Sequence, residues 1–516
     1  MSRRFSILLV VCFTVLVGGC GGGAGSASSE ASLGPVTPVR GESPTPPDTF
    51  PPAASLAAQC AAPRSGIDPG TGRAYPDRLG NVNAEKSWVR SWSNDTYLWY
   101  DEIPDALAAN YTSAVDYFAV LKTPQTTPSG KPKDKFHFTY STSDWQSLSS
   151  AGVSVGYGVE WAVLSSTPPR SIVVAQVAPG SMAEAQGLAR GALVLRVDGV
   201  DLVNGADVGT LNSGLFPRTA GQSHVFTVQD AGTTTTRQLT LVTAAVTTVP
   251  VQQVKTIPTT DGPVGYMVFN DHIATAERQL IAAVEQLKLA NIKDLVVDLR
   301  YNGGGYLDIA AQFAFMLAGP EPSAGKVFER LAFNAKNPFG YSEAALTTPF
   351  VSETLGFSTV AGRPLPSLGL KRVYVLTGSG TCSASEAVIN GLRGIGIAVH
   401  LIGATTCGKP YGFIPQDNCG VTYFSIQFKG VNQQGFGDYS DGFSPTCSMP
   451  DDYTRALGDP LEARLAAALT YRRSGVCSAP SATDARYPER KALGGQGSGQ
   501  ALTLPDQPGR SNRILR

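Results

Sequence analysis

Ser383 and Lys409 are the two residues whose types and spacing point most directly to chemistry. Ser383 lies in "TCSASEAVINGLRG", where small residues form a tight turn before a helical pattern, and Lys409 stands after the next strand, in "GATTCGKP". A serine hydroxyl becomes a strong nucleophile when a base removes its proton. A buried lysine can be that base, because burial disfavours its ammonium form. The pair therefore predicts acyl transfer, with Ser383 as nucleophile and Lys409 as general base.

Backbone N–H groups near this pair are candidates for an oxyanion hole. The N–H of Ala384 follows the nucleophile at the start of the expected helix, and Gly303 and Gly304 lie in the turn "YNGGG", which is free of Cβ atoms. Donors of this kind hold the negative charge of a tetrahedral intermediate. We expect Ala384 and one of the two glycines to supply them.

Ser383 also has a structural interpretation. Together with Glu386 it fits the capping box, Ser-x-x-Glu, that begins many helices. Capping and catalysis are compatible, since Glu386 can accept a backbone N–H while the serine acts as nucleophile. The strand before this turn, the glycine turn and Lys409 together favour the nucleophile.

Two nucleotide-binding interpretations of the glycine-rich segments fail. "YNGGGYLD" has Asp308 where a dinucleotide fold needs a third glycine, and its charge is wrong beside a pyrophosphate. "GATTCGKP" matches a phosphate-binding loop up to Pro410, which has no hydroxyl for magnesium, and "YGFIPQDNCG" does not continue as a helix. We therefore expect no nucleotide, and an ATPase built on "GATTCGKP" is left as the third alternative function.

The candidate residues belong to a segment in which strands and helices alternate. "VGYMVFN", "IKDLVVDLR", "KRVYVLTGSG" and "IAVHLIG" are apolar strand patterns, and "TAERQLIAAVEQLKLA" is a helical one. This alternation predicts an α/β core over residues 246–477. Asp298 and Arg300, at the end of one buried strand, are expected to form structural ion pairs that hold the glycine turn.

Four further segments precede or follow this core. Short β-branched runs over residues 149–245 predict a strand-rich domain, and aromatic-rich helical patterns over 60–148 predict a helical one. Residues 20–59 and 478–516 are rich in small or polar residues and are expected to be a disordered tether and tail.

The N-terminus carries an export signal. Arg3 and Arg4 precede a short apolar run that ends in "LVGGC" at Cys20, which is typical of a secretory signal over residues 1–19 and too short for a membrane span. The cysteine after two glycines resembles the lipobox of bacterial lipoproteins, and this implies a lipid on Cys20; plain secretion is the alternative. We expect a lipoprotein of the bacterial cell envelope, anchored to a membrane and facing the periplasm.

Composition limits which partners the protein is expected to bind and which bonds its cysteines are expected to form. The chain has 516 residues, enough for two or three domains, and 41 basic against 41 acidic residues without a basic block, so nucleic acid is not an expected partner. An even set of cysteines in an exported chain predicts disulfides, with Cys407–Cys419 and Cys447–Cys477 as the first pairs to test. Zinc is disfavoured because C-x-x-C spacing is absent and histidines number only four. The cysteines after the signal and lipobox are Cys60, Cys382, Cys407, Cys419, Cys447 and Cys477.

The motifs and their order resemble a known family. "GYGVEW" and "VAPGSMAEAQGLARGALVLRVDGVDL" are similar to a PDZ domain, whose loop and next strand hold a peptide C-terminus by strand addition. "DLRYNGGGYL", "TCSASEAVINGL" and "IGATTCGKP" follow, and the whole resembles the tail-specific, or carboxyl-terminal processing, serine peptidases over about residues 130–470. The PDZ-like loop that would bind the peptide consists of Gly156, Tyr157, Gly158 and Val159.

The resemblance implies a multidomain α/β (α+β) protein, with a crotonase-like peptidase core, an inserted or preceding PDZ-like domain and an N-terminal helical region. It assigns Ser383 and Lys409 to a catalytic dyad without metal or organic cofactor, and protein or peptide substrates to the active site. "DKFHFTY", with Asp134, His137 and Tyr140, is similar to the motif that precedes the PDZ domain in this family.

The sequence also departs from the family pattern. A third catalytic acid or amide is often found further along the helix or after the lysine, where this chain has Gly394 and Phe413. The Ser-Lys spacing is one residue longer than expected, and Pro410 replaces a usual glycine. His272, at a strand end, is the better histidine neighbour of the site, whereas His400 is expected to pack in the core.

These inferences combine into an exported serine endopeptidase that recognises the C-terminal segment of its substrate. The alternative from a different class is a catalytically weak, PDZ-bearing binding or adaptor protein built on a peptidase-like core.

Overall fold

The computed structural model describes residues 50–69, 71–480, 500–502 and 513–514. The expected signal peptide, Cys20 and most of the expected tether lie outside these residues. Within the described part of the chain, no helix combines the length and the apolar character needed to cross a membrane.

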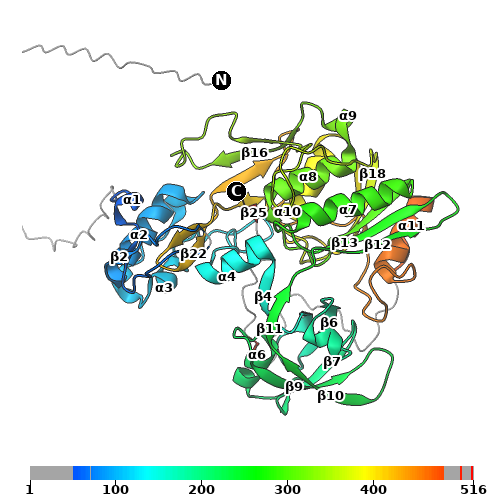
Figure 1. Cartoon of the computed structure of the whole chain (residues 1–516), viewed down its shortest axis with the longest axis horizontal. Coiled ribbons are helices and arrows are strands. Elements are labelled where there is room, and N and C mark those ends of the chain that lie inside the picture. The colour runs from blue at the N-terminus through cyan, green and yellow to red at the C-terminus, as the bar shows by residue number, and fades with distance from the viewer. Residues whose placement is uncertain (1–49, 70, 481–499, 503–512, 515–516) are drawn as a thin grey trace, which may run out of the picture. The chain divides into compact units, whose positions relative to one another are not determined.

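A six-stranded sheet forms the centre of the α/β core (Figure 1). Its outer strand β12 runs antiparallel to its neighbour, and all the other pairings are parallel. All residues of β13 and β14 are buried, as expected for parallel strands with both faces covered. In spatial order the strands are β12 (Val251–Ile257), β13 (Val264–Phe269), β14 (Asp294–Asp298), β18 (Arg372–Thr377), β19 (Ala398–Gly403) and β24 (Cys447–Ser448).

Helices cover both faces of this sheet. On one face α7 (Ala276–Leu289), α8 (Leu307–Ala318) and α10 (Ala384–Gly394) pack against alternate strand residues such as Val297 and Val375. On the other face α11 (Ala463–Ser474) packs against the intervening ones, which include Val296 and Leu376. The strand–helix alternation of the sequence therefore correctly predicted an α/β core.

The topology gathers the candidate residues at one edge of the sheet. β14, β18 and β19 are parallel neighbours, so their carboxyl ends lie together. The glycine turn follows β14, the turn with Ser383 follows β18, and the segment with Lys409 follows β19. Ligand sites of α/β sheets form at this edge, because loops from neighbouring strands meet there.

Two smaller sheets extend from the same loops. One has the order β17-β16-β23-β20, and the other has the order β21-β22-β3. The short strand β20 begins directly after Lys409-Pro410, so the lysine segment is tied to the first of these sheets. Their strands are β16 (Val327–Phe333), β17 (Thr347–Pro349), β20 (Tyr411–Gly412), β23 (Phe428–Val431), β21 (Gln416–Asn418), β22 (Val421–Phe424) and β3 (Phe138–Ser141).

The N-terminal helical segment packs onto the core rather than standing apart. β3 pairs with β22, and Trp88 and Trp92 of α2 (Val82–Thr96) pack against Tyr423 of the same strand. Residues of α1 (Ala53–Leu56) join this cluster, as does α3 (Ala114–Phe118). The tether expected over residues 20–59 therefore ends before residue 59, because the apolar side chains of α1 pack against this cluster.

A separate hydrophobic core supports the β-rich segment. Its sheet has the order β10-β9-β7-β6-β5, with β5 at the edge, and β4 (Val153–Gly156) pairs with β11 (Ala244–Thr247) where the segment enters and leaves. The remaining elements are β5 (Val159–Ser165), β6 (Ser171–Val177), β7 (Leu193–Val197), β8 (Val200–Asp201), β9 (Ser223–Gln229), β10 (Thr236–Val242), α5 (Met182–Ala185) and α6 (Val208–Leu215).

Three disulfides connect the described cysteines: Cys60–Cys419, Cys382–Cys407 and Cys447–Cys477. The predicted Cys447–Cys477 pair is confirmed, and the predicted Cys407–Cys419 pair is wrong. A hairpin does form close to these residues, but it is the short one of β21 and β22, with Cys419 at its tip. Cys407 lies outside that hairpin, beside the turn that carries Cys382.

The C-terminal segment also differs from the prediction of a disordered tail. The side chain of Leu502 is buried in the core of the β-rich segment. Arg513–Ile514 forms a short strand, β25, that pairs with β15 (Gly305–Tyr306). A polar, glycine-rich composition did not reveal these contacts, because each depends on one or two residues.

Candidate active site

Ser383 occupies a strained turn between β18 and α10. Its backbone has φ 61° and ψ −113°, a conformation that residues with a Cβ rarely adopt. Two hydrogen bonds to the carbonyl oxygen of Asn302 hold the turn, one from the N–H of Cys382 and one from Ser385 Oγ, both at 3.1 Å. Strain of this kind persists where the surroundings over-determine it, and it is concentrated at functional sites.

The hydroxyl of Ser383 is buried and has no hydrogen-bond partner among the described residues. The N–H of Ser383 instead donates to Glu386 Oε2 at 2.9 Å. The capping role thus falls to Glu386, and the serine hydroxyl is left uncommitted. A buried hydroxyl without a partner is costly, so its position is better explained by a ligand than by helix capping.

Lys409 is fully buried, and its amine also has no hydrogen-bond partner in the described part of the chain. Nζ lies 3.7 Å from the ring centroid of Phe413 and 4.8 Å from that of Phe136. Burial lowers the pKa of Lys409 well below its usual value, although the charges of Asp134 and Glu386 oppose this shift. The lowered pKa makes the neutral amine, which can accept a proton, more accessible than it is in an exposed lysine.

Glu386 joins the nucleophile's turn to the lysine segment. Its Oε2 accepts the N–H of Ser383 and, at 2.8 Å, that of Lys409. Its Oε1 accepts the N–H of Gly408 at 2.9 Å and the hydroxyl of Thr406 at 2.6 Å. Burial raises the pKa of Glu386, while these four hydrogen bonds favour the carboxylate and oppose the shift. One side chain thus fixes the backbone on both sides of the candidate dyad.

The disulfide Cys382–Cys407 adds a covalent connection between the same two segments. Cys382 directly precedes Ser383, and Cys407 lies two positions before Lys409. Lys135 Nζ donates to the carbonyl oxygen of Cys407 at 2.8 Å and so ties the N-terminal segment to this loop. The sequence predicted disulfides in this chain, but it paired Cys407 with Cys419 and not with Cys382.

The expected oxyanion donors differ in whether their backbone N–H groups already have a hydrogen-bond partner. Ala384 is the first residue of α10, where backbone N–H groups lack partners within the helix. The N–H of Gly304 donates to Asn302 Oδ1 at 2.9 Å and is therefore engaged. Gly303 is the glycine whose N–H has no partner among the described residues.

Asn302 organises the glycine turn, and the sequence analysis did not single it out. It is fully buried, and its Nδ2 donates to the carbonyl oxygen of Phe269 at 2.9 Å. His272 Nδ1 lies 3.1 Å from Asn302 Oδ1, and burial lowers the pKa of His272 to about 3. His272 is thus a neutral support of the turn. His400 lies against the rings of Tyr374 and Tyr471, as a packing role predicts.

Residues of the N-terminal segment cover the side chain of Lys409. Asp134 accepts hydrogen bonds from Tyr97 Oη at 2.7 Å and from the N–H of Phe136 at 2.9 Å, which places the Phe136 ring near the amine. Burial alone would raise the pKa of Asp134, but His137 and these hydrogen bonds lower it. The sequence related "DKFHFTY" to a family motif, but it did not predict that this segment lies near Lys409.

The two positions where a third catalytic group is often found are both apolar here. Gly394 packs so closely on Asn432 that a Cβ would lie 2.9 Å from that side chain. Phe413 is the aromatic ring nearest the lysine amine. In the described structure, aromatic rings surround Lys409 and no polar side chain orients it.

The shape of the PDZ-like loop requires glycine at position 158. Gly158 has φ 80°, and a Cβ there would lie 2.2 Å from Ser181, so only glycine fits. The side chain of Tyr157 is buried, and its hydroxyl donates to the carbonyl oxygen of Gly214 in α6 at 2.9 Å. Val159 begins β5, the edge strand of its sheet. A peptide could therefore bind through the backbone of this loop and strand.

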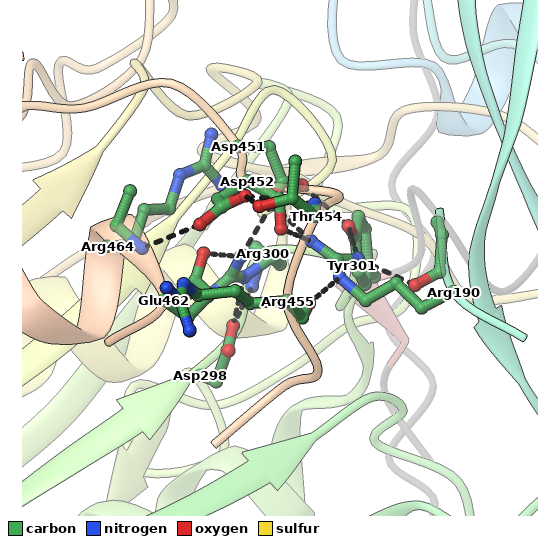
Figure 2. A network of polar contacts seen from close by, with 12 residues as sticks. Arg190, Asp298, Arg300, Tyr301, Asp451, Asp452, Thr454, Arg455, Glu462 and Arg464 are labelled. Atoms are coloured by element: carbon green, nitrogen blue, oxygen red, sulfur yellow. Dashed lines mark hydrogen bonds and ion pairs between the residues drawn. The ribbon is translucent and has the colours of Figure 1, made fainter. Parts of the chain in front are cut away.

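An ion-pair network includes residues that directly precede the glycine turn in the chain (Figure 2). Arg300 contacts Asp298 at 2.9 Å, Glu462 at 2.8 Å and Asp451 at 2.6 Å. Arg190, from the β-rich segment, contacts Asp451 at 2.6 Å and Tyr301 Oη at 2.7 Å. The prediction that Asp298 and Arg300 pair is confirmed, and the network also joins the β-rich segment to the residues before the turn.

Family models match three parts of the chain. The model of the peptidase S41 N-terminal domain matches residues 84–141, that of the PDZ domain matches 148–208, and that of peptidase family S41 matches 263–413. Their order is the order of the helical, β-rich and α/β segments. The carboxyl-terminal-processing protease of Picosynechococcus sp. is 28% identical over 268 residues, which are 51% of this chain and 54% of that protein. The chain thus spans about half the length of this curated relative.

Two solved structures are similar to the chain, and the first of them supports the fold. An S41 protease from Bacteroides fragilis is similar over 78% of this chain and 100% of its own, with a TM-score of 0.58 and 23% identity. The photosystem II D1 C-terminal processing protease is similar over 75% of this chain and 100% of its own, with a TM-score of 0.43 and 19% identity. The matched domains and their order show that the chain belongs to peptidase family S41.

Proposed function

We propose that this chain is an exported serine endopeptidase with Ser383 as nucleophile and Lys409 as general base. The observation that supports it best is the pair of buried, reactive side chains without polar partners at the ends of neighbouring parallel strands. Groups with strongly shifted pKa values in such a position are candidates for catalysis. Glu386 and the disulfide Cys382–Cys407 hold the two segments together.

The proposed reaction proceeds through an acyl-enzyme. Lys409 Nζ takes the proton of Ser383 Oγ while the oxygen attacks the peptide carbonyl, and the N–H groups of Ala384 and Gly303 stabilise the oxyanion. The lysine then gives its proton to the leaving amine, and the C–N bond breaks. A water molecule then attacks the ester carbonyl while Lys409 accepts its proton. The ester C–O bond breaks, the acid product leaves, and Lys409 returns the proton to Ser383 Oγ, which completes the cycle.

Substrate capture is assigned to the PDZ domain. The loop from Gly156 to Val159 and the edge strand β5 suit a peptide C-terminus bound by strand addition. We further propose a periplasm-facing location and a lipid anchor on Cys20, on the basis of the export signal and the lipobox-like "LVGGC".

Replacement of Ser383 tests the proposal directly. Ser383→Ala should lower kcat/KM for an unstructured protein by about 10³-fold or more, because the covalent route is lost. Ser93→Ala is a matched control, since Ser93 Oγ is also buried without a partner but lies in α2. Hydrolysis of casein, followed by release of acid-soluble peptides, measures both variants against the parent chain.

An equal rate for Ser383→Ala and the parent would refute the peptidase proposal. The adaptor alternative would then be favoured, because a degenerate core with an intact PDZ domain would still bind C-terminal peptides.

A further inference from the structure

The C-terminal strand β25 lies beside the proposed active site. Arg513 pairs with Gly305 and Ile514 with Tyr306 in a parallel register. β15 follows the glycine turn directly, and its Gly305 forms a bridge with His272. The tail backbone therefore forms a two-stranded sheet with β15, next to the residues that are expected to stabilise the oxyanion.

β25 also contacts the segment that carries the base. Among the described elements, β20 (Tyr411–Gly412) contacts β25, and β20 begins two positions after Lys409. The tail thus contacts both the strand after the glycine turn and the strand after the lysine. A peptide substrate must approach these same two segments, since one supplies an oxyanion donor and the other the base.

A second attachment holds the tail upstream of β25. Arg170 Nη2 donates to the carbonyl oxygen of Gln500 at 2.7 Å. The N–H of Leu502 donates to the carbonyl oxygen of Ser166 at 3.0 Å. Leu502 is only 5% exposed and packs in the core of the PDZ domain. The chain's own C-terminal segment is therefore attached to the PDZ domain before it pairs with β15.

We propose that β15 is the docking strand for an extended peptide substrate, and that the C-terminal segment of this chain is its internal competitor. This proposal rests on the proposed function. Main-chain hydrogen bonds of an added strand tolerate many sequences, so the tail can occupy a strand meant for varied substrates. Attachment through Leu502 gives the segment an effective concentration in the millimolar range, and even a weakly binding strand then competes.

Binding to an inactive chain tests this without turnover. In the Ser383→Ala background, a fluorescent peptide with the sequence of residues 509–516 and an amidated C-terminus is titrated against the full chain and a chain that ends at Leu502. All described buried core residues lie at or before Leu502, so the shorter chain keeps its cores. The peptide should bind the shorter chain about tenfold more tightly, because the strand is then free.

Two point variants of the full chain separate strand pairing from other effects of the tail. Ile514→Pro should bind the peptide as the shorter chain does, since proline cannot take a regular place in a sheet. Ser511→Pro, outside the paired residues, should behave as the full chain. Anisotropy measures each affinity. Amidation excludes capture of the peptide carboxylate by the PDZ domain.

Equal peptide affinity for the full and shortened chains, or binding of the free-acid peptide alone, would overturn the proposal. With Ser383 intact, the shorter chain should also cleave casein with a kcat/KM about tenfold higher. If both chains cleave at the same rate, the competitor role is refuted while the peptidase remains. If neither cleaves but the peptide affinities still differ as expected, the proposed function fails and the docking strand stands.

Discussion

Lys409 and Arg300 are both buried cationic side chains beside the carboxyl ends of the parallel strands, yet their surroundings are opposite. Arg300 makes ion pairs with Asp298, Asp451 and Glu462. Burial would lower the pKa of Arg300, but these carboxylates raise it well above its usual value. Lys409 has two aromatic rings as its nearest described partners, and burial lowers its pKa.

The difference separates a cation with a structural role from one whose environment suits the proposed general base. A buried charge is tolerated when hydrogen-bonded partners compensate its lost hydration, as around Arg300. A buried amine without such partners reduces stability, and its retention is best explained by a need for a neutral base. Both environments belong to one core, so the pairing state of each group, rather than its burial, indicates its role.

The largest expected effect is on activity when the unpaired cation is removed. Lys409→Met should lower kcat/KM by about 10³-fold, because no base remains to accept the Ser383 proton. In the parent chain kcat/KM should fall as the pH drops through the lowered pKa of Lys409, since protonation removes the free amine. A pH–rate profile of casein hydrolysis measures this. An acid limb near the usual lysine pKa of about 10.4 would contradict the proposed environment.

A large loss of stability is expected when the paired cation is removed. Arg300→Met should lower the free energy of unfolding by about 3–5 kcal/mol, because it leaves Asp298, Glu462 and Asp451 buried without their common partner. Arg330→Met removes an exposed pair with Glu343 and should cost less than about 1 kcal/mol. Urea denaturation in the Ser383→Ala background compares them. Similar losses for both variants would mean that the network does not stabilise the core.

The smallest expected effect has the opposite sign. Lys409→Met should raise the free energy of unfolding by about 1–3 kcal/mol at neutral pH, since a partnerless polar group is replaced by an apolar one. Lys86→Met is the matched control. Lys86 is also buried, but its amine donates to the carbonyl oxygens of Ala108 and Tyr111, so its loss should destabilise the chain.

The stability gained by Lys409→Met should depend on pH, because protonation of Lys409 is linked to unfolding. Between the lowered pKa of Lys409 and the unfolded value of about 10.4, the unfolded chain binds a proton that the folded chain does not. The parent therefore loses stability as the pH falls through this window, and the advantage of Lys409→Met grows. Thermal unfolding at several pH values measures the difference. A constant difference across that window would contradict the lowered pKa.

Local patterns correctly predicted the α/β core and the elements around the candidate site. Apolar strands and amphipathic helices have their own periods, so the strand before the glycine turn and the helix after Ser383 were visible in the sequence. The pairing of Asp298 with Arg300, two positions apart, was also accessible. The role of Ser383 as nucleophile, with Lys409 as base, stays a prediction.

Contacts between segments that are distant in the sequence could not be predicted from local patterns. Cys407 lies closer in sequence to Cys419 than to Cys382, but the turn after β18 brings Cys382 beside it. Phe136 reaches the lysine only because β3 pairs with β22. Each contact depends on strand register, which no short stretch of sequence specifies.

By itself the sequence determined which residue types are available at the candidate site and which elements carry them, because residue type and hydrophobic period are local properties. Only the tertiary structure decided that Glu386 bonds both reactive segments, that Lys409 has no polar partner, and that the C-terminal strand pairs with β15. These features arise where loops from different strands meet, so they follow from the packing of the whole core.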